Sequence, residues 1–123
     1  MKVIEPGHIY QLQSLDGSPY ELLTFVKRIG EKYPGNKGAA HPGTTIQEVC
    51  RALISRVEYV DGQIPNWRNK FVVLHLRAVI HLLELRAAER HGRELKAHTA
   101  GIERLPTCPT CGHIECAEHA EAL

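Results

Sequence analysis

The sequence lacks any apolar run that approaches the roughly 18 residues of a membrane-spanning helix, which argues against a transmembrane segment. Its N-terminus, MKVIEPGHIY, has no apolar stretch of signal-peptide length and no small-residue cleavage site, so we expect no export. We therefore predict a cytoplasmic protein (in the host cell cytoplasm, if a phage encodes it). In that reducing compartment, cysteines are more often free or metal-bound than paired.

The sequence also has little net charge. A formal charge of +1 argues against a nucleic-acid coat protein, which usually has a strongly basic domain. The charge is unevenly distributed, because basic residues outnumber acidic ones between Asn66 and His91. This modest positive field suits a small anion rather than a polymer. We therefore predict neither a nucleic-acid nor a membrane partner.

A catalytic set of residues is also missing. His75 and His81 do not have the i, i+4 spacing of metal ligands on one helical face. No serine, cysteine or carboxylate stands in an arranged relation to either histidine. We therefore predict that the protein is not an enzyme.

The segment 30–43 is rich in glycine and proline and resembles a phosphate-binding loop only superficially. The glycine spacing fits, but Asn36 stands where the motif needs a lysine, so we reject that interpretation. Two alternatives remain. The segment is a solvated connector, or it touches a ligand through Lys32, Lys37 and its backbone amides.

The first part of the chain has a β pattern. Residues 8–15 alternate between apolar and polar, the segment DGSP at 16–19 favours a turn, and residues 20–28 are rich in β-branched and aromatic side chains. We predict an antiparallel hairpin. Because a two-stranded hairpin is marginally stable alone, it must pack on the helices that follow or on another copy of itself.

Two helices follow. Thr45 and Glu48 form a capping-box pattern that begins a helix over about 45–60, and on its apolar face Cys50 is most simply a small hydrophobe. A second, long helix is predicted over about 67–91, ending at Gly92. The long helix is apolar over most of its circumference, so it is central to the monomer or pairs with its counterpart in a homo-oligomer. We favour the homo-oligomer.

The polar residues of the long helix fall on two faces. Arg77, His81 and Glu84 share a stripe, which we interpret as a solvent-facing line with a salt-linked pair. Arg86 lies among apolar neighbours instead, and a buried arginine needs a partner. That partner is a carboxylate, solvent reached near the helix end, or an anionic ligand that the guanidinium holds through two hydrogen bonds.

The tail, CPTCGHIECAEH, has the spacing of a zinc knuckle. Cys108, Cys111, Cys116 and His119 supply a complete tetrahedral set for a structural Zn²⁺, and His113 competes as the fourth ligand. The alternative is a loosely ordered, reduced tail without metal. Four filled positions leave no place for a substrate, so we interpret the cluster as a structural element.

Several sequence segments, taken together, resemble the phage anti-Thoeris proteins of the first type over about residues 3–92. They are EPGHIYQLQSLDG, LTFVKR, EKYPGN, HPGTTIQEVCRALISR and LELRAAERHG, in this order. The resemblance implies a small antiparallel sheet with two helices, assembled as a homodimer or hexamer with pockets near protomer interfaces. It implies that the protein binds a cyclic nucleotide immune signal, glycocyclic ADP-ribose and in hexameric members also cyclic oligonucleotides, without cleaving it. Anti-phage defence would be blocked by this sequestration.

The resemblance also implies ligand-binding residues. By position they are Arg28, Tyr59, Asn69 and Arg86. Arg28 and Arg86 would hold the pyrophosphate, Tyr59 would stack on adenine, and Asn69 would hydrogen-bond the base or ribose.

These observations predict an α+β fold: a small N-terminal antiparallel sheet packed with two helices, the second long, and a short metal-binding tail. They divide the chain into a ligand-binding domain, 1–92, and a C-terminal extension, 93–123. The alternative function is that of a small zinc-binding interaction or regulatory protein that acts through its C-terminal knuckle.

Overall fold

The structure is a computed structural model, and it describes residues 1–92. Three strands precede two helices: β1 (Lys2–Glu5), β2 (Ile9–Leu12), β3 (Glu21–Thr24), α1 (Ile46–Gln63) and α2 (Arg68–His91). The strands form one antiparallel sheet in the order β1-β2-β3, and α2 is the longer helix. The α+β class is confirmed, whereas the predicted zinc tail lies outside the described residues.

The predicted hairpin is present as β2 and β3, which pair from Ile9↔Thr24 to Leu12↔Glu21. Sequence analysis missed β1, which pairs with β2 through Val3↔Tyr10. Only four residues long and interrupted by a register shift, β1 is too short to show clear alternation in the sequence.

The helix ends agree closely with the sequence pattern. The hydroxyl of Thr45 accepts a hydrogen bond of 3.2 Å from the backbone N–H of Glu48, as expected for an N-cap. Helix α1 continues to Gln63, past its predicted end near residue 60. Gly92 ends α2 with φ 62°, the left-handed conformation that favours glycine at this position.

The two helices pack against each other along one small apolar seam. Cys50, Ile54 and Ile80 are buried there, with Val73 and Leu76 packed against them. The interpretation of Cys50 as a small hydrophobe is confirmed, and burial raises the pKa of its thiol. A thiol with a raised pKa is a poor nucleophile, which fits a structural role.

Ion pairs flank this seam. Arg51 Nη2 lies 3.4 Å from Glu84 Oε1, and Arg77 Nη2 lies 3.6 Å from Glu58 Oε1. The predicted solvent-facing line is therefore wrong for Arg77 and Glu84, because both side chains reach across to α1. Their polar stripe lies at the edge of the helix–helix interface, where solvent still screens the charges.

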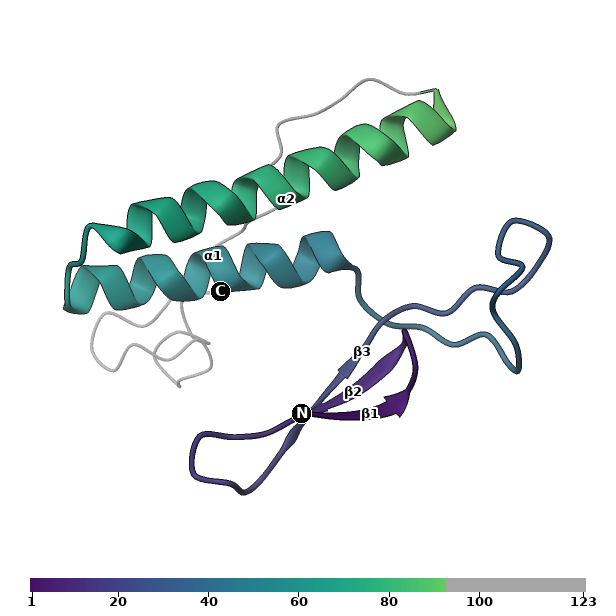
Figure 1. The fold of residues 1–123 in the computed structure, drawn as a ribbon, viewed down its shortest axis with the longest axis horizontal. Coiled ribbons are helices and arrows are strands. Elements are labelled where there is room, and N and C mark those ends of the chain that lie inside the picture. The colour runs from purple at the N-terminus through teal and green to yellow at the C-terminus, as the bar shows by residue number, and fades with distance from the viewer. Residues whose placement is uncertain (93–123) are drawn as a thin grey trace, which may run out of the picture.

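The sheet lies apart from the helices (Figure 1). Within residues 1–92 no strand packs against either helix, so the predicted packing between sheet and helices is not made within the described part of one chain. Many large apolar side chains are left exposed on both parts. On the helices they are Ile46, Leu53, Tyr59, Val60, Phe71, Val72, Leu74, Val79, Leu82 and Leu85. The other predicted location, on a second copy of the chain, stays a prediction.

In the part of the chain that the structure describes, neither helix has the combination of length and apolar character needed to cross a bilayer.

Candidate functional site

The chain beyond β3 forms a long loop whose two ends are held together. The backbone N–H of Lys27 donates to the carbonyl of His41 at 3.0 Å, and the N–H of His41 donates back to Lys27 at 3.1 Å. Two residues further on, Gly43 passes so close to the segment just after β3 that an added Cβ would lie 2.5 Å from the carbonyl carbon of Phe25. Only glycine fits that approach. The loop 28–40 therefore leaves and re-enters the fold at one fixed place.

A cluster of charged and titratable side chains holds the two paired ends of this loop against β1. The ammonium of Lys27, which is buried, pairs with the carboxylate of Glu5. That carboxylate also has His41 Nε2 at 3.4 Å and His8 Nδ1 at 3.8 Å, although His41 Nε2 is not aligned for a hydrogen bond. The hydrogen bond from Lys27 holds the pKa of Glu5 below its ordinary value.

The loop itself is compact at its start. The N–H of Tyr33 donates to the carbonyl of Gly30 at 2.9 Å, and the N–H of Asn36 donates to that of Tyr33 at 3.1 Å. The side-chain amide of Asn36 then reaches back to the carbonyl of Arg28 at 2.7 Å. These three bonds close residues 28–36 on themselves. Lys32 and Tyr33 are thereby presented from an ordered turn.

Lys32 and Tyr33 meet Arg86 and Arg90 of α2 around a cavity of about 490 Å³, which we call the Arg86 cavity. Arg86 and Arg90 are one helical turn apart, so both project from the same side of α2. None of the described residues that line this cavity is acidic, and three of the four are basic. Within residues 1–92, Arg86 and Arg90 have no ion-pair partner. Such a set of cations attracts an anion.

Arg86 is exposed in the single chain, so of the three partners considered for its guanidinium, solvent near the helix end is the one that it reaches there. Its apolar neighbours Val72, Val79 and Leu82 are exposed as well. The face that looks apolar in the sequence is therefore a surface in the described chain.

The four predicted ligand-binding residues fall into two groups. Arg28 stands at the base of the loop and lines a cavity with Lys27 and His41, while Arg86 lies in the Arg86 cavity. Tyr59 and Asn69 lie where α1 turns into α2. There the hydroxyl of Tyr59 accepts a hydrogen bond of 3.0 Å from Gln63 Nε2.

The distance between the groups is large. At 1.5 Å per residue, Asn69 and Arg86 are about 25 Å apart along α2. A compact pocket of about 1,000 Å³, near the upper limit for small-molecule sites, is only about 12 Å across. One ligand therefore cannot touch both Arg86 and Asn69 in a single chain.

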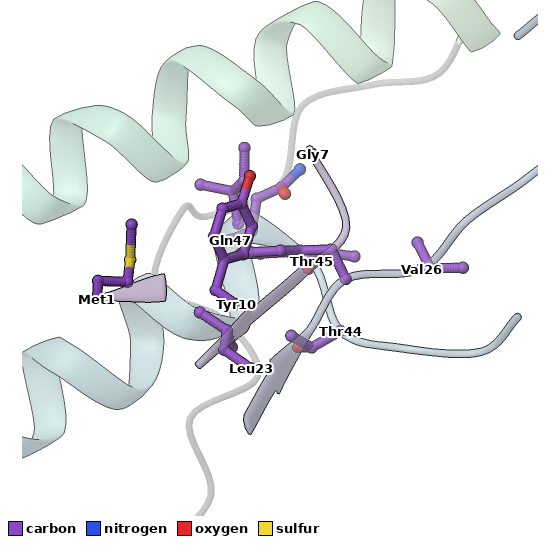
Figure 2. Close-up of a pocket in the computed structure, with 10 residues that line it drawn as sticks. Met1, Gly7, Tyr10, Leu23, Val26, Thr44, Thr45 and Gln47 are labelled. Carbon is purple, nitrogen blue, oxygen red and sulfur yellow. The ribbon is translucent and has the colours of Figure 1, made fainter. Parts of the chain in front are cut away.

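A third cavity lies between the sheet and the start of α1 (Figure 2). It has a volume of about 580 Å³ and is lined largely by apolar side chains, among them Met1, Tyr10, Leu23, Phe25 and Ile46. Figure 2 shows Tyr10 and Leu23 on the strands beside Thr45 and Gln47 at the start of α1. No described side chain that lines it is charged, so this cavity is suited to apolar packing rather than to phosphate.

The metal prediction is not tested by the described residues. Cys108, Cys111, Cys116, His113 and His119 all lie beyond residue 92. Within residues 1–92, no group of three or more histidine, cysteine, aspartate or glutamate side chains is placed to hold a metal ion.

Sequence reasoning did not single out Tyr33 or Arg90. The signal for Arg90 was present, since two arginines four residues apart share a helical face. Lys32 was considered only as one of several loop cations. Nothing in the sequence indicated that the loop reaches the far end of α2.

Comparison with known proteins found no family model that matches the chain, and no curated protein or solved structure matched it either. The function is therefore argued from the residues and their geometry.

Proposed function

We propose that the protein binds and sequesters a small phosphate-bearing signal molecule of the cyclic nucleotide class, and does not cleave it. The observation that carries this proposal is the Arg86 cavity, in which Arg86, Arg90 and Lys32 gather around a space with no described acidic lining residue. Guanidinium groups match phosphate oxygens through paired hydrogen bonds, which gives both affinity and orientation.

The resemblance to the anti-Thoeris proteins of the first type supplies the class of ligand. It points to glycocyclic ADP-ribose, with cyclic oligonucleotides as further candidates. The order of elements agrees with what the resemblance implies, because a small antiparallel sheet precedes two helices. By this proposal the protein acts in the cytoplasm of an infected cell and lowers the free concentration of a defence signal.

A binding site that uses all four predicted residues requires two copies of the chain. Arg86 lies toward the C-terminal end of α2 and Arg28 at the base of the loop, whereas Tyr59 and Asn69 lie where α1 turns into α2. In a homodimer or hexamer, the Arg86 end of one protomer can adjoin the Tyr59 end of another. The exposed apolar faces of the helices and of the sheet favour such an assembly, because burying them removes apolar surface from water.

The experiment that tests the function separates capture from cleavage. The full-length protein is incubated with glycocyclic ADP-ribose, filtered to remove free ligand, and heated to release what it holds. We expect mass spectrometry to recover intact signal. Recovery of a degraded product, or retention of no ligand at all, would overturn the proposal.

A matched pair of variants links capture to the cavity. Arg86→Ala removes one cation from the Arg86 cavity, whereas Arg56→Ala removes one from the exposed surface of α1. We expect Arg86→Ala to abolish retention and Arg56→Ala to leave it unchanged. Equal effects of the two variants would show a nonspecific charge effect rather than a site.

A further inference from the structure

The Arg86 cavity is built by two separate segments of the chain. Helix α2 contributes Arg86 and Arg90, and the loop contributes Lys32 and Tyr33. The loop residues are held before any ligand arrives, because the turn 28–36 is closed by its own hydrogen bonds. A binding surface that is already ordered loses less conformational entropy when the ligand binds.

We propose that Lys32, Tyr33 and Arg90 complete a diphosphate subsite around Arg86, and that Tyr33 is the aromatic platform for the ligand's ring. The proposal rests on the proposed function and names further residues of the same site. It assigns the phosphates to the three cations and the adjoining nucleoside ring to Tyr33.

The spacing of the cations favours a diphosphate over a single phosphate. The Cβ atoms of residues four apart on a helix are about 5–6 Å apart, so the two guanidinium groups can converge on neighbouring phosphates. Lys32 adds a third positive charge from the opposite segment. A diphosphate that links two sugars carries two negative charges and offers acceptors to all three cations. A monophosphate ester such as AMP carries a similar charge, about −1.5 to −2 at pH 7, but it offers its oxygens on a single phosphorus atom that the three cations must share.

The position of Tyr33 favours a stacking role. Its side chain is half-buried and lines the same cavity as the cations. The side chain of Tyr59, by contrast, is 61% exposed and lies at the other end of the helix pair. Tyr33 therefore lines the same cavity as Arg86 within one chain, and its ring is placed to stack on a ligand that Arg86 holds.

The test measures binding to the full-length protein by calorimetry, with ADP-ribose, inorganic pyrophosphate, AMP and adenosine as probes at one fixed salt concentration. We expect ADP-ribose to bind most tightly, pyrophosphate to bind measurably, AMP to bind at least tenfold more weakly than ADP-ribose, and adenosine to show no binding. Equal affinity for AMP and ADP-ribose would overturn the diphosphate assignment. Absence of binding by both ADP-ribose and pyrophosphate would overturn the subsite.

Variants then test each residue against ADP-ribose. Arg90→Ala and Lys32→Ala each remove charged hydrogen bonds, so we expect affinity to fall by about tenfold to a hundredfold. Tyr33→Ala should weaken binding by about fivefold to a hundredfold, the range for one stacked base, while Tyr33→Phe should retain it. Arg56→Ala is the control for net charge.

These outcomes distinguish the subsite from the wider function. If Arg86→Ala abolishes capture of glycocyclic ADP-ribose while Arg90→Ala, Lys32→Ala and Tyr33→Ala leave it unchanged, the function stands and the subsite is wrong. If wild-type protein retains no signal, the function itself fails. All three positions are exposed or half-buried, and circular dichroism of each variant checks that its fold is intact.

Discussion

The side-chain amide of Asn69 donates a hydrogen bond of 2.9 Å to the carboxylate of Asp61, and so fastens the first turn of α2 to the last turns of α1. The backbone N–H of Asn66 donates to the same carboxylate oxygen at 3.0 Å. The hydrogen bond from Asn69, assisted by that from Asn66, holds the pKa of Asp61 below its ordinary value. Asn69 thus has a structural task, whatever it contributes to a ligand.

Asn69→Asp should destabilise the helix pair at neutral pH, because it replaces a donor with a second carboxylate beside Asp61. We expect a lower midpoint of thermal unfolding at pH 7, and a smaller difference from wild type near pH 4, where one of the two carboxyls is protonated. Calorimetric unfolding at both pH values checks this. A variant as stable as wild type at pH 7 would show that the bond contributes little.

Ile80→Ala should cost about 2–5 kcal/mol of stability, the usual range for removing a fully buried aliphatic side chain down to alanine. The seam between α1 and α2 is small, so the loss is a large fraction of the total stability of such a domain. Urea unfolding gives the difference in free energy. Ser55→Ala, on the exposed side of α1, is the matched control and should change stability by no more than about 0.5 kcal/mol.

Acid should weaken the attachment of the loop to β1. Because the pKa of Glu5 is lowered in the folded protein, its contribution to stability is complete above the ordinary carboxyl value of 4.5 and is lost as the pH falls through the folded value. We expect wild type to lose stability below about pH 4.5. Glu5→Gln should be less stable at pH 7, since Lys27 stays buried without its counter-charge, and should lose less on acidification. Thermal unfolding from pH 7 to pH 3 measures both effects.

Leu82→Lys should dissociate the proposed oligomer. Leu82 is exposed on the apolar side of α2, and a lysine there places a charge in any interface formed by that face. Light scattering should give a multiple of the 13.8 kDa chain for wild type and a smaller mass for the variant. Ser55→Lys, on an exposed polar position of α1, should leave the mass unchanged. A monomeric wild-type protein would contradict the prediction.

Metal analysis tests the tail. We expect about one Zn²⁺ per chain in the full-length protein, and loss of the metal in Cys108→Ser and Cys111→Ser, because thiolates are its principal ligands. If the metal is structural and separate from the ligand, these variants should still retain glycocyclic ADP-ribose. Loss of capture in both variants, with the fold of residues 1–92 intact, would favour the zinc-dependent interaction protein instead.

The elements were predictable where a local signal marks them. The capping pattern at Thr45, the glycine at residue 92 and the turn between β2 and β3 each result from interactions among neighbouring residues, and each was found. Strand β1 was missed because four residues are too few to establish a period. The helical periodicity placed Arg77 and Glu84 on one stripe of α2, but periodicity alone does not show that this stripe lies beside α1.

The candidate site depends on contacts between distant segments, and no local pattern reports those. Arg86 was recognised because a charge stands out on an apolar helix. Lys32 was considered only as one of several loop cations and Tyr33 not at all, because their relation to α2 depends on where the loop 28–40 is anchored. That anchor is the pairing of Lys27 with His41 and Glu5, which combines a strand end, a loop end and β1.

The wide separation of Arg86 from Asn69 along α2 has a consequence for how such a protein would work in a cell. A site completed only between chains forms in proportion to the concentration of assembled protein, not of single chains. Capture would then rise more steeply than linearly as the protein accumulates. While the concentration of the protein is still low, most of the signal would remain unbound. Once expression passes the concentration at which the chains assemble, each added chain would complete binding sites that are incomplete in the unassembled chains.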